Sequence, residues 1–130
     1  MAVKIKQYYD IKFPFTANNE NGMFIDLNGS VVDKVSSQIA HLILTQKGTR
    51  LRMPNFGTDL LKYVFSPNDN ISWSAVESEI RTAVGIYVPS ASIKSVGVTM
   101  GDSDNDVMVD VKYSVTTGKE SEDYRMAIKL

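Results

Sequence analysis

The chain has 130 residues, of which 43% are hydrophobic and 22% are charged, a composition that favours one globular domain over a disordered chain. Its 14 basic and 15 acidic residues give a formal net charge of -1, which argues against nucleic-acid binding, because that function needs a basic surface. The absence of cysteine excludes disulfides and thiolate chemistry, and the absence of a long apolar run predicts a soluble, cytoplasmically made protein without signal peptide or membrane span.

The first 28 residues are predicted to form an extended N-terminal segment. Apolar side chains alternate loosely with polar ones from Val3 to Phe15, as in a strand, and Pro14 limits such a strand to the edge of a sheet. The polar run from Ala17 to Gly22 is typical of a turn. We expect this segment to pack along the domain or to contact a partner.

A helical part is predicted over residues 29–90. Ser30 and Asp33 form a capping pattern at the start of the first helix, and apolar residues follow at helical spacing. This apolar stripe consists of Val32, Val35, Ile39, Leu42 and Ile43. Gly48 is placed as the left-handed residue that ends the helix. His41 is the only histidine, and it lies between the apolar positions, where a structural role is favoured over a ligand role.

A short second helix is predicted after a fixed loop. Pro54 excludes helix at the residue before it, and Asn55 or Thr58 caps the helix that follows. The buried stripe of this helix is Leu60, Leu61, Val64 and Phe65, and Pro67 ends it. Phe56 lies in the loop, and we expect it to be buried against Val35, Ile39 and Leu60 or their neighbours, because a large apolar ring is costly in water.

The third helix is predicted to start at Ser72 or Ser74. Ser74 and Glu77 form a second capping box there, and Pro89 ends the helix. Its apolar face consists of Val76, Ile80, Ala83, Val84 and Tyr87. Trp73 is expected to cover the core from the first turn.

The remaining residues, 91–130, are predicted to form a β-meander. An apolar run from Ile93 to Met100 is followed by strict apolar and polar alternation from Val107 to Val115, the pattern of a strand with one buried face. A turn is placed from Thr117 to Asp123, and a last strand from Tyr124 to Leu130. The predicted fold class is α+β, a single domain with three helices packed on one face of an antiparallel meander.

One stretch resembles the signature of a known family. The residues that carry the resemblance are Thr45, Gln46, Lys47, Gly48, Thr49, Arg50, Pro54, Asn55, Phe56, Gly57, Thr58, Leu60, Phe65 and Pro67. They resemble the small baseplate wedge proteins of contractile-tailed phages, the lysozyme-like wedge or GPW family, which also occur in type VI secretion and related injection systems. The structural motif within this stretch is Gly48, Arg50, Pro54, Phe56 and Gly57.

The resemblance implies a structural protein of the virion's tail baseplate, assembled in the host cytoplasm, with no cofactor. The implied partners are a larger baseplate wedge subunit and the tail sheath protein, with hub or tube proteins as further candidates and neither nucleic acid nor membrane. The family usually carries a Glu-Pro-Arg triplet that docks onto the larger subunit, and the matching positions here are Val88, Pro89 and Ser90. Without the charged side chains, docking would need apolar contact through Val88 and Pro89, and the alternative is a plain helix stop.

The last predicted strand is a candidate for pairing with the sheath, since sheath subunits are linked by strand exchange and the family is thought to offer the first sheet. Its residues are Tyr124, Arg125, Met126, Ala127, Ile128, Lys129 and Leu130. Only Arg125 and Lys129 discourage pairing at this edge, and the chain offers no later element to cover it, so an arm could add by backbone hydrogen bonds. The alternative is that the segment from Val3 to Phe15 covers the edge within the chain.

Catalytic chemistry finds little support in the sequence. Glu77 and Glu79 are two residues apart on a helix and point to different sides, unlike the paired carboxylates of a glycosidase. The acidic run Asp102, Asp104 and Asp106 lacks the glycine and glutamate of a calcium loop, so a solvated turn is favoured. No nucleophile turn lies near His41. A cell-wall hydrolase and an unrelated α+β binding module are the alternatives to the structural role.

Overall fold

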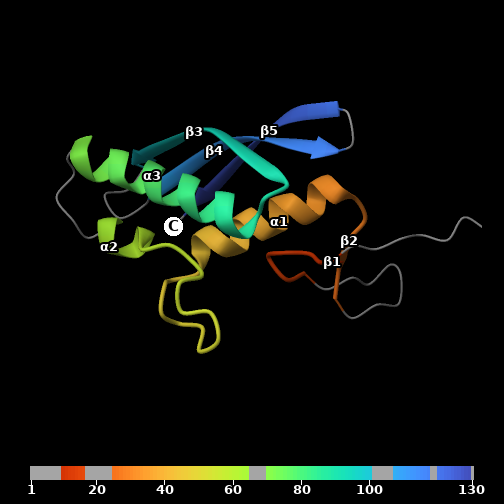
Figure 1. Cartoon of the computed structure of the whole chain (residues 1–130), viewed down its shortest axis with the longest axis horizontal. Helices are drawn as coiled ribbons and strands as arrows, with labels where there is room; N and C mark the ends of the chain where they lie inside the picture. Colours follow the sequence, from red (N-terminus) through yellow and green to blue (C-terminus); the bar gives the residue numbers. More distant parts are fainter. Residues whose placement is uncertain (1–9, 17–24, 65–69, 101–106, 118–119, 130) are drawn as a thin grey trace, which may run out of the picture.

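The structure is a computed structural model that describes residues 10–16, 25–64, 70–100, 107–117 and 120–129. Figure 1 shows how the helices and strands are arranged. In chain order they are β1 (Asp10–Ile11), β2 (Leu27–Asn28), α1 (Val31–Leu44), α2 (Leu60–Val64), α3 (Asn70–Tyr87), β3 (Ala91–Met100), β4 (Val107–Thr117) and β5 (Glu120–Lys129). We name residues 45–59, between α1 and α2, the connecting loop.

The larger sheet has the strand order β3-β4-β5, and both of its pairings are antiparallel. The helices α1 and α3 lie side by side on one face of this sheet, where α1 contacts β4 and α3 contacts β3 (Figure 1). The helix α2 has only five residues and packs against α3. The predicted combination of helices with an antiparallel sheet is therefore confirmed, but two helices rather than three form the layer over the sheet.

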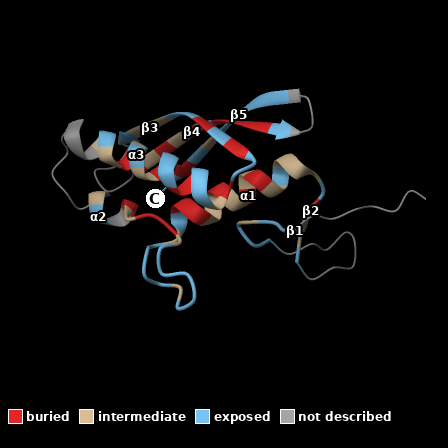
Figure 2. Cartoon of the chain, in the orientation of Figure 1, coloured by how far each residue is buried: buried red, intermediate tan, exposed pale blue. Residues whose placement is uncertain are grey.

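The hydrophobic core lies between these two helices and the sheet, where Figure 2 shows the buried residues facing one another. Its main members are Val35, Ile39, Leu42 and Ile43 of α1, Val76, Ile80, Ala83 and Val84 of α3, and Val107, Val109, Val111, Tyr113 and Val115 of β4. Burying a side chain such as Ile39 contributes about 1.5–3 kcal/mol. The predicted stripes of the first and third helices and the buried face of β4 are confirmed, except that Val32 and Tyr87 are half-buried.

The start of α1 agrees with the sequence prediction, and its end does not. Ser30 is the N-cap, and its Oγ accepts a hydrogen bond from the backbone N of Asp33 over 3.1 Å. The C-cap is Thr45, whose N–H donates to the carbonyl of His41. Gly48 does have a left-handed φ of 84°, but it lies in the connecting loop and does not terminate the helix.

The predicted caps of the other two helices are wrong. The hydroxyl of Thr58 donates to the backbone O of Ile43 over 2.8 Å, so it ties the connecting loop to α1 instead of capping α2. Since α3 begins at Asn70, Ser74 and Glu77 lie inside the helix and form no capping box. Further expectations fall outside the described residues, namely those on Val3 to Tyr9, Ala17 to Gly22, Phe65, Pro67, Asp102, Asp104, Asp106 and Leu130.

The strands β1 and β2 form a separate antiparallel pair beside α1. Buried Asn28 organises it, because its side-chain Nδ2 donates to the carbonyl of Ile11 and its Oδ1 accepts from the Ser37 hydroxyl, both over 3.2 Å. The backbone N of Phe13 donates in turn to Ser37 Oγ. Residues 10–16 thus pack along the helical side of the molecule, and this part of the N-terminal segment does not cover β5.

The hairpin between β4 and β5 is longer than the sequence predicted. The pairing continues to Thr117 opposite Glu120, so the turn expected from Thr117 to Asp123 is wrong. The polar run at the start of β5 is extended because its residues pair with β4 while their side chains face solvent. On the other side of the sheet, the register of β3 shifts between Ile93 and Ser95, which leaves Lys94 in a bulge.

Candidate interaction surfaces

The connecting loop is held closed at its base by backbone hydrogen bonds. Thr58 N donates to Thr45 O, and Gly48 N donates to Pro54 O, each over 2.8 Å. Gly48 and Gly57 have φ values of 84° and 114°, which side chains with a Cβ adopt only under strain. A Cβ on Gly57 would also collide with the Thr45 carbonyl. The two glycines of the motif therefore allow the loop to close tightly against the end of α1.

The arginine and the phenylalanine of the motif form one stack beside α1. The guanidinium of Arg50 lies 4.0 Å from the ring centroid of Phe56, and its Nη2 is 3.2 Å from Nε2 of His41. The Phe56 ring also packs edge-on against Tyr87 of α3, with centroids 5.0 Å apart. Burial, together with the charge of Arg50, lowers the pKa of His41, so the neutral imidazole can accept from the guanidinium.

The expectation that Phe56 packs against the core is confirmed, but the ring is not fully buried. The ring is half-buried at the margin of the core, and its ring partners are His41 and Tyr87. The expectation that His41 is structural agrees with this position, since its neighbours are Arg50 and aromatic rings. Through Tyr87, the stack connects the connecting loop to the end of α3.

The turn from α3 into β3 contains the segment proposed for docking. Val88 N donates to Val84 O over 2.8 Å, and Ala91 N donates to Val88 O over 3.1 Å, so the turn is fixed. The side chain of Val88 is only 3% exposed and belongs to the core of this chain, whereas Pro89 and Ser90 are exposed. The structure thus leaves Pro89 and Ser90 as the accessible part of this segment, with Val88 as its anchor.

An exposed isoleucine lies next to this turn, and the sequence analysis missed it. Ile86 is 65% exposed on the last turn of α3. It borders a groove of about 590 Å³ lined by Lys47, Asn55, Ala75, Ser78, Glu79, Thr82, Ala83, Ile86 and Tyr87. The only available signal was that Ile86 falls off the predicted apolar stripe, and an apolar residue off the stripe indicates exposed hydrophobic surface.

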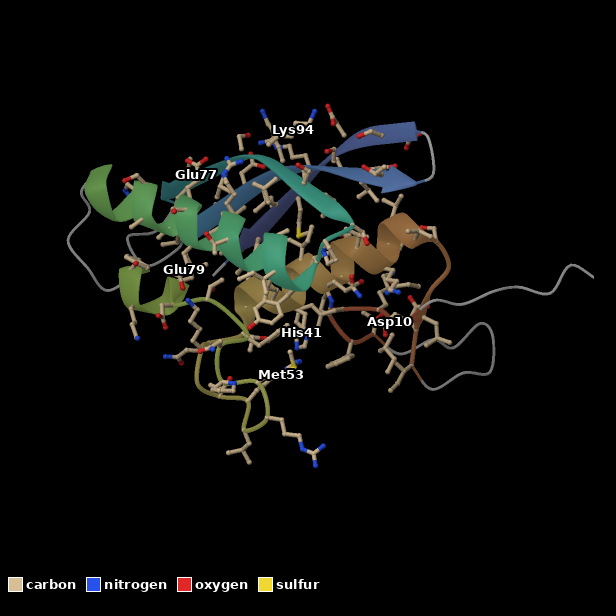
Figure 3. All side chains as sticks on the ribbon, viewed as in Figure 1. Asp10, His41, Met53, Glu77, Glu79 and Lys94 are labelled. Carbon is tan, nitrogen blue, oxygen red and sulfur yellow. The ribbon has the colours of Figure 1, made fainter. Side chains whose placement is uncertain are left out.

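The carboxylate of Glu79, which lies on α3 and lines this groove, contacts the connecting loop. Glu79 Oε1 accepts a hydrogen bond from the backbone N of Asp59 over 2.8 Å and lies 2.9 Å from Nζ of Lys47. The hydrogen bond to Glu79 raises the pKa of Lys47, so this ammonium stays charged. Glu79 therefore organises the start of α2, and Figure 3 shows it on the side of α3 that faces α2.

The carboxylates of α3 do not form a catalytic pair. Glu77 lies 2.9 Å from Nη2 of Arg81, one turn along the helix, while Glu79 is engaged with the connecting loop. The two carboxylates serve different elements, as Figure 3 shows from their separate positions. Across the described residues, no group of three or more histidine or acidic side chains could hold a metal ion. None of the described helices is long and apolar enough to span a membrane.

The two edges of the larger sheet differ. Among the described residues, β5 pairs with β4 alone, and its backbone runs without a bulge. Its side chains alternate, with Ile128 buried, Tyr124 and Met126 half-buried, and Arg125 and Ala127 exposed. The alternation predicted for this strand is confirmed. It fixes the strand's register and leaves one regular strand edge that faces no other described strand.

The β3 edge is occupied by a side chain from α3. Nη1 of Arg81 donates to the backbone O of Ile93 over 2.8 Å, and Nη2 reaches the O of Lys94 over 3.4 Å. Both carbonyls lie at the bulge of β3. Bulges and charged side chains are devices that protect sheet edges, so β3 is a poor template for another strand.

The solvent-facing side of the sheet carries paired charges. Arg125 Nε lies 2.9 Å from each carboxylate oxygen of Asp110, and Nη2 also contacts Asp110. The hydrogen bond from Arg125 holds the pKa of Asp110 below its usual range. Lys94 Nζ lies 3.2 Å from Asp123 across the same face. Because the side chain of Arg125 points toward β4, it discourages strand pairing at the outer edge of β5 less than the sequence predicted.

Residues 30–120 match the family described as baseplate wedge protein gp25. A similar relative is the baseplate wedge protein gp25 of Enterobacteria phage T4, which is 30% identical over 81 residues. That alignment covers 62% of this chain and 61% of the relative, so it spans less than two thirds of the relative's length.

Two solved structures share the fold. A putative tail lysozyme from Geobacter sulfurreducens superposes with a TM-score of 0.64 at 20% identity, covering 78% of this chain and 92% of that one. A chain of the anti-feeding prophage baseplate superposes with a TM-score of 0.60 at 14% identity, covering 90% of this chain and 81% of that one. At these identities the likeness concerns the arrangement of helices and strands alone.

Proposed function

The chain belongs to the baseplate wedge protein gp25 family, and from this membership we propose that it is a structural subunit of the baseplate of a contractile tail or injection system. In this role it docks onto a larger wedge subunit and offers its sheet as the template for the first ring of tail sheath. It is assembled in the host cytoplasm and resides in the tail baseplate of the virion.

The observation that carries the templating role is the difference between the sheet edges. A strand added to β5 would extend a regular antiparallel ladder whose register is fixed by the buried Ile128. Added to β3, it would meet the bulge and the Arg81 side chain on the carbonyls of Ile93 and Lys94. An arm from a sheath subunit therefore fits one edge of this sheet, by backbone hydrogen bonds.

The docking role is supported by the turn after α3. Pro89 and Ser90 are exposed beside Ile86, and the stack on Phe56 fixes the neighbouring Tyr87. An apolar contact by Ile86 and Pro89 replaces the charge-assisted contact that the family's triplet would make. The segment keeps a fixed backbone for this purpose, because Val88 anchors it in the core.

A wall-hydrolase function is the second candidate, since one structural neighbour is called a putative tail lysozyme. The two carboxylates that would be needed are engaged separately, Glu77 with Arg81 and Glu79 with Lys47. Retaining and inverting glycosidases both need two carboxyl groups facing one bond. We therefore propose a non-enzymatic role, and the pure protein should not lower the turbidity of a bacterial wall suspension.

The templating role can be tested with proline substitutions in β5. Consecutive amides of a strand point to opposite sides, so Met126→Pro and Ala127→Pro remove donors on opposite edges of β5. One of the two variants loses a backbone hydrogen bond to β4 and becomes less stable. The other loses only a backbone N–H that points away from β4. The stable variant, identified by its thermal midpoint, should give baseplates that carry no full-length sheath in electron micrographs.

A matched control comes from the opposite edge of the sheet. Ser95→Pro and Val96→Pro apply the same change to β3, beside its bulge. The more stable of these two should allow normal sheath assembly. Full-length sheath on baseplates containing the stable β5 proline variant would exclude β5 as the template while leaving the docking role open.

A further inference from the structure

The connecting loop projects away from the body of the molecule and exposes apolar side chains at its tip (Figure 1). We name residues 49–53 the tip. The side chain of Leu51 is fully exposed and that of Met53 is 43% exposed. Figure 3 shows Met53 on this loop. The fully exposed Leu51 contributes nothing to the core, and together with Met53 it places two exposed apolar side chains within five residues of the loop.

The tip is held in place by contacts within the loop and by one contact with α1. Thr49 Oγ1 donates to Gln46 O over 2.7 Å, and Phe56 N donates to Met53 O over 3.0 Å. The guanidinium of Arg50 is fixed between the Phe56 ring and the His41 imidazole. A loop fixed in this way loses little further conformational entropy on binding, which favours its use as a preformed contact.

The tip also carries positive charge that the chain does not neutralise. The neighbours of Arg50 are a neutral ring and an imidazole, not a carboxylate. Arg52 is exposed, and within the described part of the chain no acidic side chain lies within ion-pair distance of it. The whole chain has a formal net charge of -1, so this basic character is local to the tip.

We propose that the tip inserts Leu51 into an apolar pocket on another protein subunit, and that carboxylates around this pocket contact Arg50 and Arg52. Such a partner matches the tip in both hydrophobicity and charge. The identity of the partner as a subunit of the same baseplate rests on the proposed function. The contact itself lies on the projecting loop, away from the edge of β5 and from the turn at Pro89.

Two other occupants fit the tip less well. An anionic membrane would attract the arginines, but Leu51 and Met53 are too few to anchor a protein that has no amphipathic surface helix at the tip. A symmetric dimer joined tip to tip would bring the arginines of two copies together without a carboxylate between them. A protein pocket with an acidic rim is the partner that matches both the exposed leucine and the arginines of the tip.

Photo-cross-linking in assembled particles tests this contact. A benzophenone amino acid replaces Leu51 in cells that assemble the tail, and the purified particles are irradiated and analysed by mass spectrometry. The same amino acid at Thr99, exposed on β3, is the matched control. We expect position 51 to link to one other subunit, at a site whose apolar residues are flanked by Asp or Glu, and Thr99 not to link there.

Substitutions measure how much the contact contributes. With the linked subunit purified as the probe, Leu51→Asp should weaken its affinity about ten- to a hundredfold, the factor that corresponds to burial of one leucine. Leu51→Met and Arg52→Lys should retain affinity within about threefold, and Arg52→Glu should reduce it. Leu51 and Arg52 both lie in solvent, so none of the four substitutions should change the thermal midpoint of the free protein.

Each contrary outcome has a distinct meaning. Particles that contain the chain but give no link from position 51, or only links between copies of this chain, overturn the tip contact and leave the proposed function standing. Binding to phosphatidylglycerol vesicles that Leu51→Asp abolishes would assign the tip to a membrane instead. If the chain is absent from purified particles altogether, the proposed function and the tip contact both fail.

Discussion

The larger sheet of this protein has two edges, and within the described residues only the β3 edge is protected. β3 bulges at Lys94, and Arg81 of α3 covers the carbonyls of Ile93 and Lys94. β5 is regular, and among the described residues β4 is its only neighbour in the sheet. Soluble proteins normally protect both edges against association, so an edge that keeps its pairing groups accessible marks a place where another chain can add.

The protection of β3 comes from the same residues that hold α3 on the sheet. Arg81 pairs with Glu77 on the helix and reaches two carbonyls of the strand. In β5, the side chain of Arg125 is turned toward Asp110 of β4. Protection therefore follows from where the helices lie, and the edge far from α3 is covered by no other described strand.

The largest loss of stability is expected from a change in β4, the central strand, which pairs with both edge strands. Val111→Ala removes two methyl groups from a side chain with no exposed surface, and should lower the free energy of unfolding by about 2–4 kcal/mol. Chemical denaturation of the purified variant measures this loss. Sheath assembly should fall with stability and recover at lower temperature, which distinguishes this variant from the proline variant of β5. A loss below about 0.5 kcal/mol would contradict the assigned core.

A smaller effect should follow from uncovering β3. Arg81→Ala removes the hydrogen bonds to Ile93 and Lys94 and should cost about 1 kcal/mol, since the side chain is half exposed. It should also make the protein associate in a concentration-dependent way in analytical ultracentrifugation, because a second edge opens. Glu77→Gln is the control, since it removes the ion pair and keeps the bonds to β3. If the Arg81→Ala variant stays monomeric and keeps its stability, Arg81 does not protect β3, and the two edges do not differ in the way described.

The smallest effect concerns the pairing of Asp110 with Arg125. The pKa of Asp110 is lower in the folded protein than its usual value of 3.8, so its stabilising contribution is present above that value and is lost as the pH falls through the folded pKa. Asp110→Asn should therefore reduce the acid sensitivity of the thermal midpoint below about pH 4 and have little effect at pH 7. An unchanged pH profile would show that the pair does not hold Arg125 against β4.

The sequence was informative where one segment carries its own pattern. Alternation placed β4 and the buried face of β5, and the Ser30 pattern located the start of α1. The turn before β5 was misplaced because Ser121 to Asp123 are polar, as in a loop, although they pair with β4. The spacing of apolar residues indicates which face of a strand is buried. The end of a hairpin that extends beyond the core has no buried face, so its sequence shows no such spacing.

Features that join distant segments could not be predicted. The bonds of Arg81 to β3 and of Glu79 to the backbone of Asp59 connect side chains to main-chain atoms, which carry no residue signature. The burial of Val88 was also missed, because Val88 was assigned together with Pro89 to an apolar docking contact with a partner. Gly57 illustrates the opposite case: its identity indicated a special backbone, and the structure supplies the reason in the closeness of Thr45.

The central claim is that β5 receives a strand from the sheath, and a cryo-EM reconstruction of the baseplate with its first sheath ring tests it most directly. We predict a fourth strand, from a sheath subunit, hydrogen-bonded to β5 between Ser121 and Ile128, with the β3 edge and its Arg81 contacts unchanged. A map in which the sheath contacts this chain only through side chains, or in which another segment of this chain covers β5, would contradict it.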